Sequence, residues 1–152
     1  MLPTKRPIFS RRVSSCPTDL CVSKVRILLD THAIVWWAAG DERLSRKARL
    51  TIADPDTEVF ISIASAWEIQ IKATLQKLTL NETVDALYRS LIIDHEFRMI
   101  GIELNDIDCL STLPPHHRDP FDRMLVAQAG RSGLALVTKD RVMSSYGVPT
   151  LW

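Results

Sequence analysis

Four acidic residues lie at the positions where proteins of alternating strands and helices usually bind ligands. Asp30 and Asp140 directly follow apolar runs typical of strands, and Glu68 and Asp122 lie in the first turns of helices expected beside such strands. In open α/β sheets, ligands bind at the carboxyl ends of the strands. Crowded carboxylates raise one another's pKa unless a cation neutralises them, and their oxygens suit Mg²⁺ or Mn²⁺. We therefore predict a divalent-metal site that polarises a phosphodiester and activates water for in-line attack.

Taken singly, each acid also has a purely structural explanation. Carboxylates favour helix N-termini, where free N–H groups and the helix dipole attract negative charge. Glu68 completes the segment Ser65-Ala66-Trp67-Glu68, an S-x-x-E capping box, and Asp119 before Pro120 is typical of an N-cap. These roles require no catalysis, so the metal site depends on all four acids meeting at one edge of a sheet.

The strands that would bring the acids together are recognisable from apolar, β-branched runs. Residues 25–29, just before Asp30, are typical of a strand buried on both faces, as a parallel sheet covered by helices requires. Because Pro149 has no backbone N–H to donate to a neighbouring strand, the last strand is expected at an edge of the sheet. The other expected strands are Glu58–Ile63, Arg98–Ile102, Leu134–Thr138 and, at that edge, Val148–Trp152.

Helices are expected between these strands. Their expected ranges are 31–39, Arg46–Ala53, Ser65 to about Lys77, Glu82 to about Asp94, a turn near Asn105–Leu113, Pro120 to about Ser132, and Arg141–Tyr146. Ser45 and Asn81 are the expected N-caps of the second and fourth helices, and Gly40 and Gly133 end the helices before them. The alternation predicts the α/β class, with a three-layer α/β/α arrangement around a mostly parallel sheet of about five strands.

Length and composition indicate one globular domain. The chain has 152 residues, of which 46% are hydrophobic and 24% charged. No apolar run approaches the roughly 18–20 residues that a membrane span needs, so we expect no membrane association. Three cysteines without a CxxC or zinc-ligand spacing indicate a reducing compartment. We therefore expect a cytoplasmic protein.

The first 24 residues differ from the rest of the chain. They carry five basic side chains against one acidic, contain three prolines, and show no apolar periodicity. A signal peptide would need an apolar stretch of about 7–15 residues, which this segment lacks. We predict a disordered basic tail over residues 1–24. The abrupt change at Val25 suggests the hypothesis that the natural protein starts there and does not include the tail.

Four segments of the remaining chain form a recognisable set. They are LLDTHAIVWW (Leu28–Trp37), SIASAWEIQIK (Ser62–Lys72), HHRDPFDRMLVAQA (His116–Ala129), and LVTKD with YGV (Leu136–Asp140 and Tyr146–Val148). In kind and order they resemble the PIN-domain family and, within it, the VapC-type toxins of toxin–antitoxin pairs. The resemblance identifies residues 25–152 as a PIN-like nuclease domain.

This resemblance implies an endoribonuclease, dependent on Mg²⁺ or Mn²⁺, that leaves a 3′-hydroxyl and a 5′-phosphate. It also implies a cognate antitoxin that holds the toxin inactive, and commonly a homodimer. The family's metal-binding and catalytic acids correspond to Asp30, Glu68, Asp122 and Asp140. Asp30 would be the central ligand, Asp122 and Asp140 would complete the site directly or through water, and Glu68 would be a ligand or orient the attacking water. Asp119 is a second-tier ligand.

Other polar residues near the acids have more than one interpretation. Thr31 and Thr138 could hydrogen-bond the carboxylates and so fix them. Arg123 could offset the acidic cluster or contact phosphate. The pair His116-His117 could supply metal ligands or phosphate donors, although a solvated loop pair is favoured.

Basic and aromatic residues outside the acid set suggest partner surfaces. Arg46, Lys47 and Lys72 could hold the RNA backbone, against the alternative of a solvated helix face. Trp36 and Trp37 could receive the antitoxin, Trp37 in an exposed apolar groove. Core packing is the default for both, and for Trp67, because all three lie in amphipathic helices.

Two other functions share an α/β fold with strand-end acids. A phospho-acceptor receiver would use Asp30 with Thr138 and Lys139, but it does not need Glu68 or Asp122. A nucleotide-binding module would need GxxxxGK[ST] or GxGxxG, and neither is present. Either would be an α/β module without nuclease activity, and a stable aspartyl phosphate after treatment with a small phosphodonor would favour the receiver.

Overall fold

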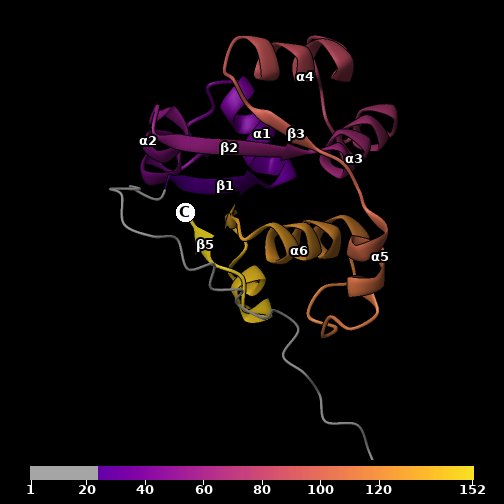
Figure 1. Cartoon of the computed structure of the whole chain (residues 1–152). Helices are drawn as coiled ribbons and strands as arrows, with labels where there is room; N and C mark the ends of the chain where they lie inside the picture. Colours follow the sequence, from indigo (N-terminus) through magenta and orange to yellow (C-terminus); the bar gives the residue numbers. More distant parts are fainter. Residues whose placement is uncertain (1–23) are drawn as a thin grey trace, which may run out of the picture.

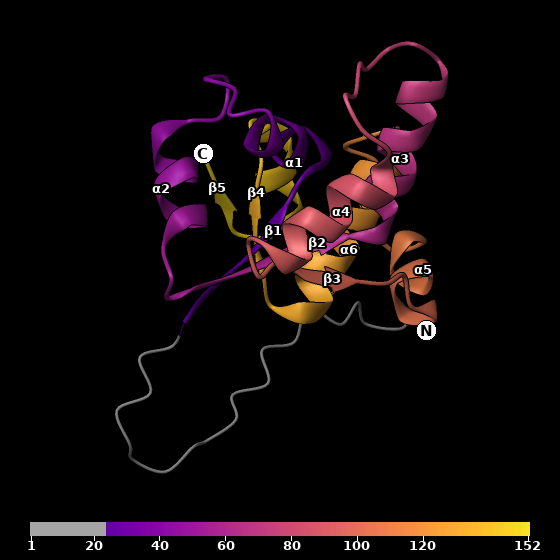
Figure 2. The ribbon, with the colours of Figure 1, turned by 90° about the horizontal axis from the view of Figure 1, so that it is seen from above.

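The computed structural model describes residues 24–152, so the predicted tail over 1–24 lies, except for Lys24, outside the described residues. The described part contains a five-stranded sheet of order β3-β2-β1-β4-β5, and every neighbouring pair is parallel. Figures 1 and 2 show the sheet between two groups of helices. The predicted three-layer α/β/α class is confirmed.

The elements follow the predicted order with small shifts at their ends. The strands are β1 (Val25–Leu29), β2 (Thr57–Ser62), β3 (Arg98–Ile100), β4 (Ala135–Val137) and β5 (Thr150–Leu151). The helices are α1 (Thr31–Ala38), α2 (Arg46–Ala53), α3 (Ile63–Thr74), α4 (Val84–Ile93), α5 (Leu104–Leu110), α6 (Pro120–Ser132) and the 3₁₀ helix η1 (Arg141–Tyr146). β5 lies at an edge of the sheet, as Pro149 predicted.

The last three residues of the central strand β1 are buried on both faces and divide the core in two. Ile27 and Leu29 point to the side packed by α1, α2, α3 and α4. Leu28 points to the opposite side, where α6 and η1 pack. Because successive side chains of a strand face opposite ways, a continuous apolar run is what this two-sided burial requires.

The start of α3 differs from the prediction. β2 runs directly into α3 at Ile63 with no loop between them, and the helix is capped by Ser62, whose hydroxyl accepts a hydrogen bond from Ala64 N at 3.0 Å. The capping box of Ser65 with Glu68 is therefore wrong. Asn81 is also not a cap, because the hydroxyl of Thr83 accepts from Ala86 N at 3.2 Å and begins α4.

The two serines of this junction give a matched pair of variants. Ser62→Ala should lower the free energy of unfolding by about 1 kcal/mol, because it removes the acceptor at the helix start. Ser65→Ala should change it by less than about 0.5 kcal/mol or raise it, since the buried Ser65 hydroxyl has no hydrogen-bond partner to lose. Urea denaturation of both variants measures these changes. A larger loss of stability in Ser65→Ala than in Ser62→Ala would show that Ser65, as first predicted, caps the helix.

Within residues 24–152, no helix combines the length and the apolar character needed to cross a lipid bilayer.

Candidate metal centre

Asp30 lies at the carboxyl end of the central strand and begins α1. Its backbone N–H donates to Val137 O on the neighbouring strand β4 at 3.1 Å, and its Oδ1 accepts from Ala33 N at 2.6 Å. The side chain is buried, and burial raises its pKa above the ordinary aspartate range. The Thr138 hydroxyl and the Ala33 N–H favour the charged form, while the charge of Glu68 opposes it.

Asp140 occupies the equivalent end of β4. Its backbone N–H donates to Thr138 Oγ1 at 3.1 Å, and its Oδ1 accepts from Val142 N at 2.8 Å, which caps η1. Partial burial would raise the pKa of Asp140, but hydrogen bonds from His117 and Val142 outweigh it and lower the pKa. Thr138 thus hydrogen-bonds the backbone N–H of Asp140 and not its carboxylate, while its hydroxyl favours the charged form of Asp30.

Asp122 enters from the first turn of α6. Asp119 caps this helix by accepting from Phe121 N at 2.8 Å, and Pro120 occupies its first position, as predicted. Burial raises the pKa of Asp122 to about 6, and the negative charges of Asp119, Glu68 and Asp30 act in the same direction. Asp122 therefore lies within electrostatic reach of two other predicted site acids.

Glu68 is buried and held by two side chains. The Thr31 hydroxyl donates a hydrogen bond to Glu68 Oε2, and Lys72 Nζ lies 2.6 Å from Glu68 Oε1. Thr31 therefore fixes an acid of the predicted set. Because α3 starts at Ile63, Glu68 lies in the second turn of the helix and not in the first, where it was predicted.

Three of the four predicted acids line one pocket of about 310 Å³. Its lining residues are Asp30, His32, Trp36, Asp122, Thr138, Lys139 and Asp140. Glu68 is outside this lining, although its charge acts on both Asp30 and Asp122. The structure thus brings Asp30, Asp122 and Asp140 together around one space and leaves Glu68 beside it.

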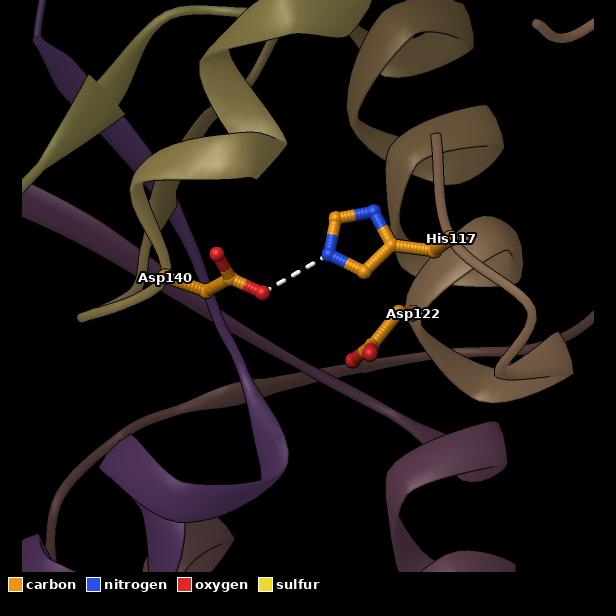
Figure 3. A group of neighbouring side chains, drawn as sticks. All are labelled: His117, Asp122 and Asp140. Carbon is orange, nitrogen blue, oxygen red and sulfur yellow. Dashed lines mark hydrogen bonds and ion pairs between the residues drawn. The ribbon is translucent and has the colours of Figure 1, made fainter. Parts of the chain in front are cut away.

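His117 is a site residue that the sequence interpretation placed in a solvated loop. Its Nε2 lies 2.7 Å from Asp140 Oδ2, and its side chain is only 11% exposed. One ligand atom each from His117, Asp122 and Asp140 lies within 4.8 Å of the others. Figure 3 shows the imidazole and both carboxylates directed into the same space. The favoured interpretation of His117 as a solvated loop residue is therefore wrong.

Arg123 does not face the acids. Its guanidinium donates to Pro114 O at 2.7 Å and to Leu110 O at 2.8 Å, so it fixes the connection between α5 and α6. These hydrogen bonds favour a structural role for Arg123, and its role as a counter-charge or phosphate contact stays a prediction.

The three tryptophans lie in three different environments. Trp36 is 8% exposed and packs edge-on against Trp152, so it forms part of the core and not an exposed docking surface. Trp37 is half-buried against Phe97, and its role in partner binding stays a prediction. Trp67 is 60% exposed, so its predicted core packing is wrong.

The proposed RNA contacts stay predictions. Arg46 and Lys47 are exposed on α2, while Lys72 is engaged by Glu68 as described.

The donor set fits a divalent cation. Carboxylate oxygens with an adjacent imidazole are ligands for Mg²⁺, Mn²⁺ and related ions. The raised pKa values of Asp30 and Asp122 reflect burial together with crowding of like charge, which a cation between the carboxylates would offset. The residues that would hold it are Asp30, Asp122 and Asp140, with Glu68 and Asp119 at the margin.

Comparison with known proteins gives consistent relatives. Residues 27–149 match the PIN domain family. The chain is 32% identical over 130 residues to ribonuclease VapC22 of Mycobacterium tuberculosis. The matched region covers 83% of this chain and 98% of that protein. VapBC2 from Rickettsia felis, solved bound to a DNA fragment from its promoter, has a TM-score of 0.61 at 12% identity, covering 84% of this chain and 98% of that one. FitAcB from Neisseria gonorrhoeae has a TM-score of 0.52 at 16% identity, covering 83% and 96%.

Proposed function

The chain belongs to the PIN-domain family, and from this premise we propose that it is a metal-dependent endoribonuclease that acts as the toxin of a toxin–antitoxin pair. The observation that carries the proposal is the pocket in which Asp30, Asp122 and Asp140 converge. The name of the 32% identical relative, a ribonuclease, supports RNA as the substrate. Family membership makes a receiver or nucleotide-binding module the weaker alternative.

The side chains have distinct proposed roles. Asp30 is the central ligand, fixed by Ala33 N and Thr138, and Asp122 and Asp140 complete the protein side of the site. When bound, Mg²⁺ or Mn²⁺ would neutralise the carboxylates, polarise the phosphodiester and lower the pKa of water. Glu68, held by Thr31 and Lys72 beside the pocket, has the proposed role of a further ligand or of the group that orients the attacking water. Asp119 adds negative charge at the margin.

The partners follow from the same proposal. The likeness to VapBC2 and FitAcB supports a cognate antitoxin, for which the accessible part of Trp37 is a candidate contact. Arg46 and Lys47 are candidate contacts for the RNA backbone, whose charge attracts cations. We also propose a homodimer and a cytoplasmic location, where the RNA substrate is.

A cleavage assay on end-labelled single-stranded RNA tests this function. We expect no cleavage in EDTA, cleavage after Mg²⁺ or Mn²⁺ is restored, and products that carry a 3′-hydroxyl and a 5′-phosphate. These ends distinguish the protein from contaminating metal-independent ribonucleases, which leave a cyclic or 3′-phosphate. Undiminished cleavage in EDTA would contradict the proposal.

A further inference from the structure

We propose that His117 supplies a nitrogen ligand to the metal centre, which becomes a mixed nitrogen–oxygen site that selects Mn²⁺ over Mg²⁺. The inference rests on the proposed function and concerns the ligand set of the same site. Its starting point is the compact group of His117, Asp122 and Asp140, whose ligand atoms lie within 4.8 Å of one another. Figure 3 shows the three side chains around one space.

The spacing of this group suits a shared ion. Ligands that lie about 2.0–2.2 Å from an ion are separated from one another by about 3 Å when adjacent and about 4.4 Å when opposite. His117 Nε2 and Asp140 Oδ2 are 2.7 Å apart, so a small opening of this hydrogen bond would place both atoms at adjacent positions.

Tyr146 holds the imidazole for this role. The His117 backbone N–H donates to Tyr146 Oη at 2.7 Å, and His117 Nδ1 lies 3.3 Å from the same oxygen. A ligating imidazole usually directs its second ring nitrogen to such a partner, which fixes the ring and its tautomer. In this structure Nε2–H donates to Asp140 Oδ2, so a metal ion requires the other tautomer. With the proton moved to Nδ1 and directed to Tyr146 Oη, the lone pair of Nε2 would face the carboxylates.

Tyr146 is itself well fixed. It is the last residue of η1 and only 7% exposed, and its ring stacks on His117 with centroids 5.6 Å apart. The orientation of His117 is thus maintained by the buried core and not by the loop that carries it. A solvated loop histidine would have no such support.

The chemical consequence is ion selectivity. Mg²⁺ prefers oxygen ligands and keeps much of its water, whereas imidazole binds transition ions better. A nitrogen ligand therefore raises the affinity for Mn²⁺ relative to Mg²⁺. Removal of His117 should lower the affinity for Mn²⁺ by at least about tenfold, since loss of even an outer partner of a ligand has that effect. The affinity for Mg²⁺ should fall by less.

Electron spin-echo measurements on Mn²⁺ bound to the purified protein, without RNA, test the assignment directly. We expect modulation from directly bound ¹⁴N in the native chain, and its replacement by the ¹⁵N pattern when histidine is ¹⁵N-labelled. His117→Gln should bind Mn²⁺ without that modulation, because glutamine offers an oxygen. His32→Gln, which changes the histidine that lines the pocket, and His116→Gln should retain it.

The outcomes separate the two proposals. Bound Mn²⁺ without nitrogen modulation, or modulation that persists in His117→Gln, overturns the ligand assignment and leaves the nuclease proposal standing. If Mn²⁺ and Mg²⁺ do not bind the native chain and RNA is not cleaved, both proposals fail. Isotope labelling leaves the native residues in place, so it shows without any variant that a histidine binds the ion, and the retained signal in His32→Gln and His116→Gln then assigns it to His117.

Discussion

Asp30→Asn is expected to reduce RNA cleavage by about 10²–10³-fold or more while the fold remains intact. The substitution removes the negative charge of the central proposed ligand but keeps an oxygen at Oδ1. That oxygen can still accept the Ala33 N–H that starts α1, and asparagine caps helices as well as aspartate does. The variant should therefore lose function without losing the strand–helix junction.

The same variant should be more stable than the native chain when metal is absent. Burial raises the pKa of Asp30 in the folded state above its unfolded value. Above the folded pKa, the ionised carboxylate therefore lowers the stability of the metal-free fold, and this cost disappears as pH falls below the unfolded pKa. The asparagine of the variant carries no such charge, so the melting temperature of Asp30→Asn in EDTA at neutral pH should be higher and less dependent on pH.

Single-turnover cleavage in saturating Mg²⁺ or Mn²⁺, with melting curves in EDTA, measures both effects. Asp85→Asn is the matched control, because Asp85 is an exposed acid on α4 that pairs with Arg89. It should leave cleavage unchanged. Cleavage by Asp30→Asn at the native rate in a metal-replete assay would remove Asp30 from the site.

Arg131→Met is expected to lower the free energy of unfolding by about 2–4 kcal/mol. Arg131 Nε lies 2.6 Å from Oδ1 of Asp106, whose side chain has no exposed surface. Asp106 also accepts from Glu103 N at 2.8 Å and so begins α5. Loss of the guanidinium leaves a buried carboxylate without its cation, and removing one partner of such a pair costs more than the pair contributes.

Chemical denaturation of a small variant set tests this. Arg89→Met breaks the exposed Arg89–Asp85 pair and should cost less than about 1 kcal/mol. Adding Asp106→Asn to Arg131→Met should recover part of the loss, since asparagine keeps an acceptor for Glu103 N without the charge. A loss below about 1 kcal/mol in Arg131→Met would show that water reaches Asp106 and solvates it.

The acids that end parallel strands were predictable because strand burial and chain order determine where they meet. Residues 25–29 identify a strand covered on both faces, and the apolar run before Asp140 identifies another. β1 and β4 are indeed parallel neighbours, with Leu29 opposite Val137. Asp30 follows β1 directly, and Asp140 follows β4 after Thr138 and Lys139.

The other site residues depend on contacts that sequence periodicity does not reveal. Ser62 and Ser65 are both plausible caps, and only the absence of a loop after β2 decides between them. His117 lies in an irregular connection, where its position depends on a hydrogen bond to Tyr146, 29 residues away. Its place two residues before the cap of α6 was the available signal, because that start already carries Asp119 and Asp122.

Asp30 and Asp140 each cap the helix that follows their strand, using one carboxylate oxygen for a backbone N–H. Aspartate and asparagine codons differ by one base, and asparagine serves a helix start equally well. We therefore expect a single transition at either codon to inactivate the enzyme while the protein still folds. For a gene whose product is the proposed toxin, inactive alleles of this kind should arise readily and persist. Their folded products should still bind the proposed antitoxin.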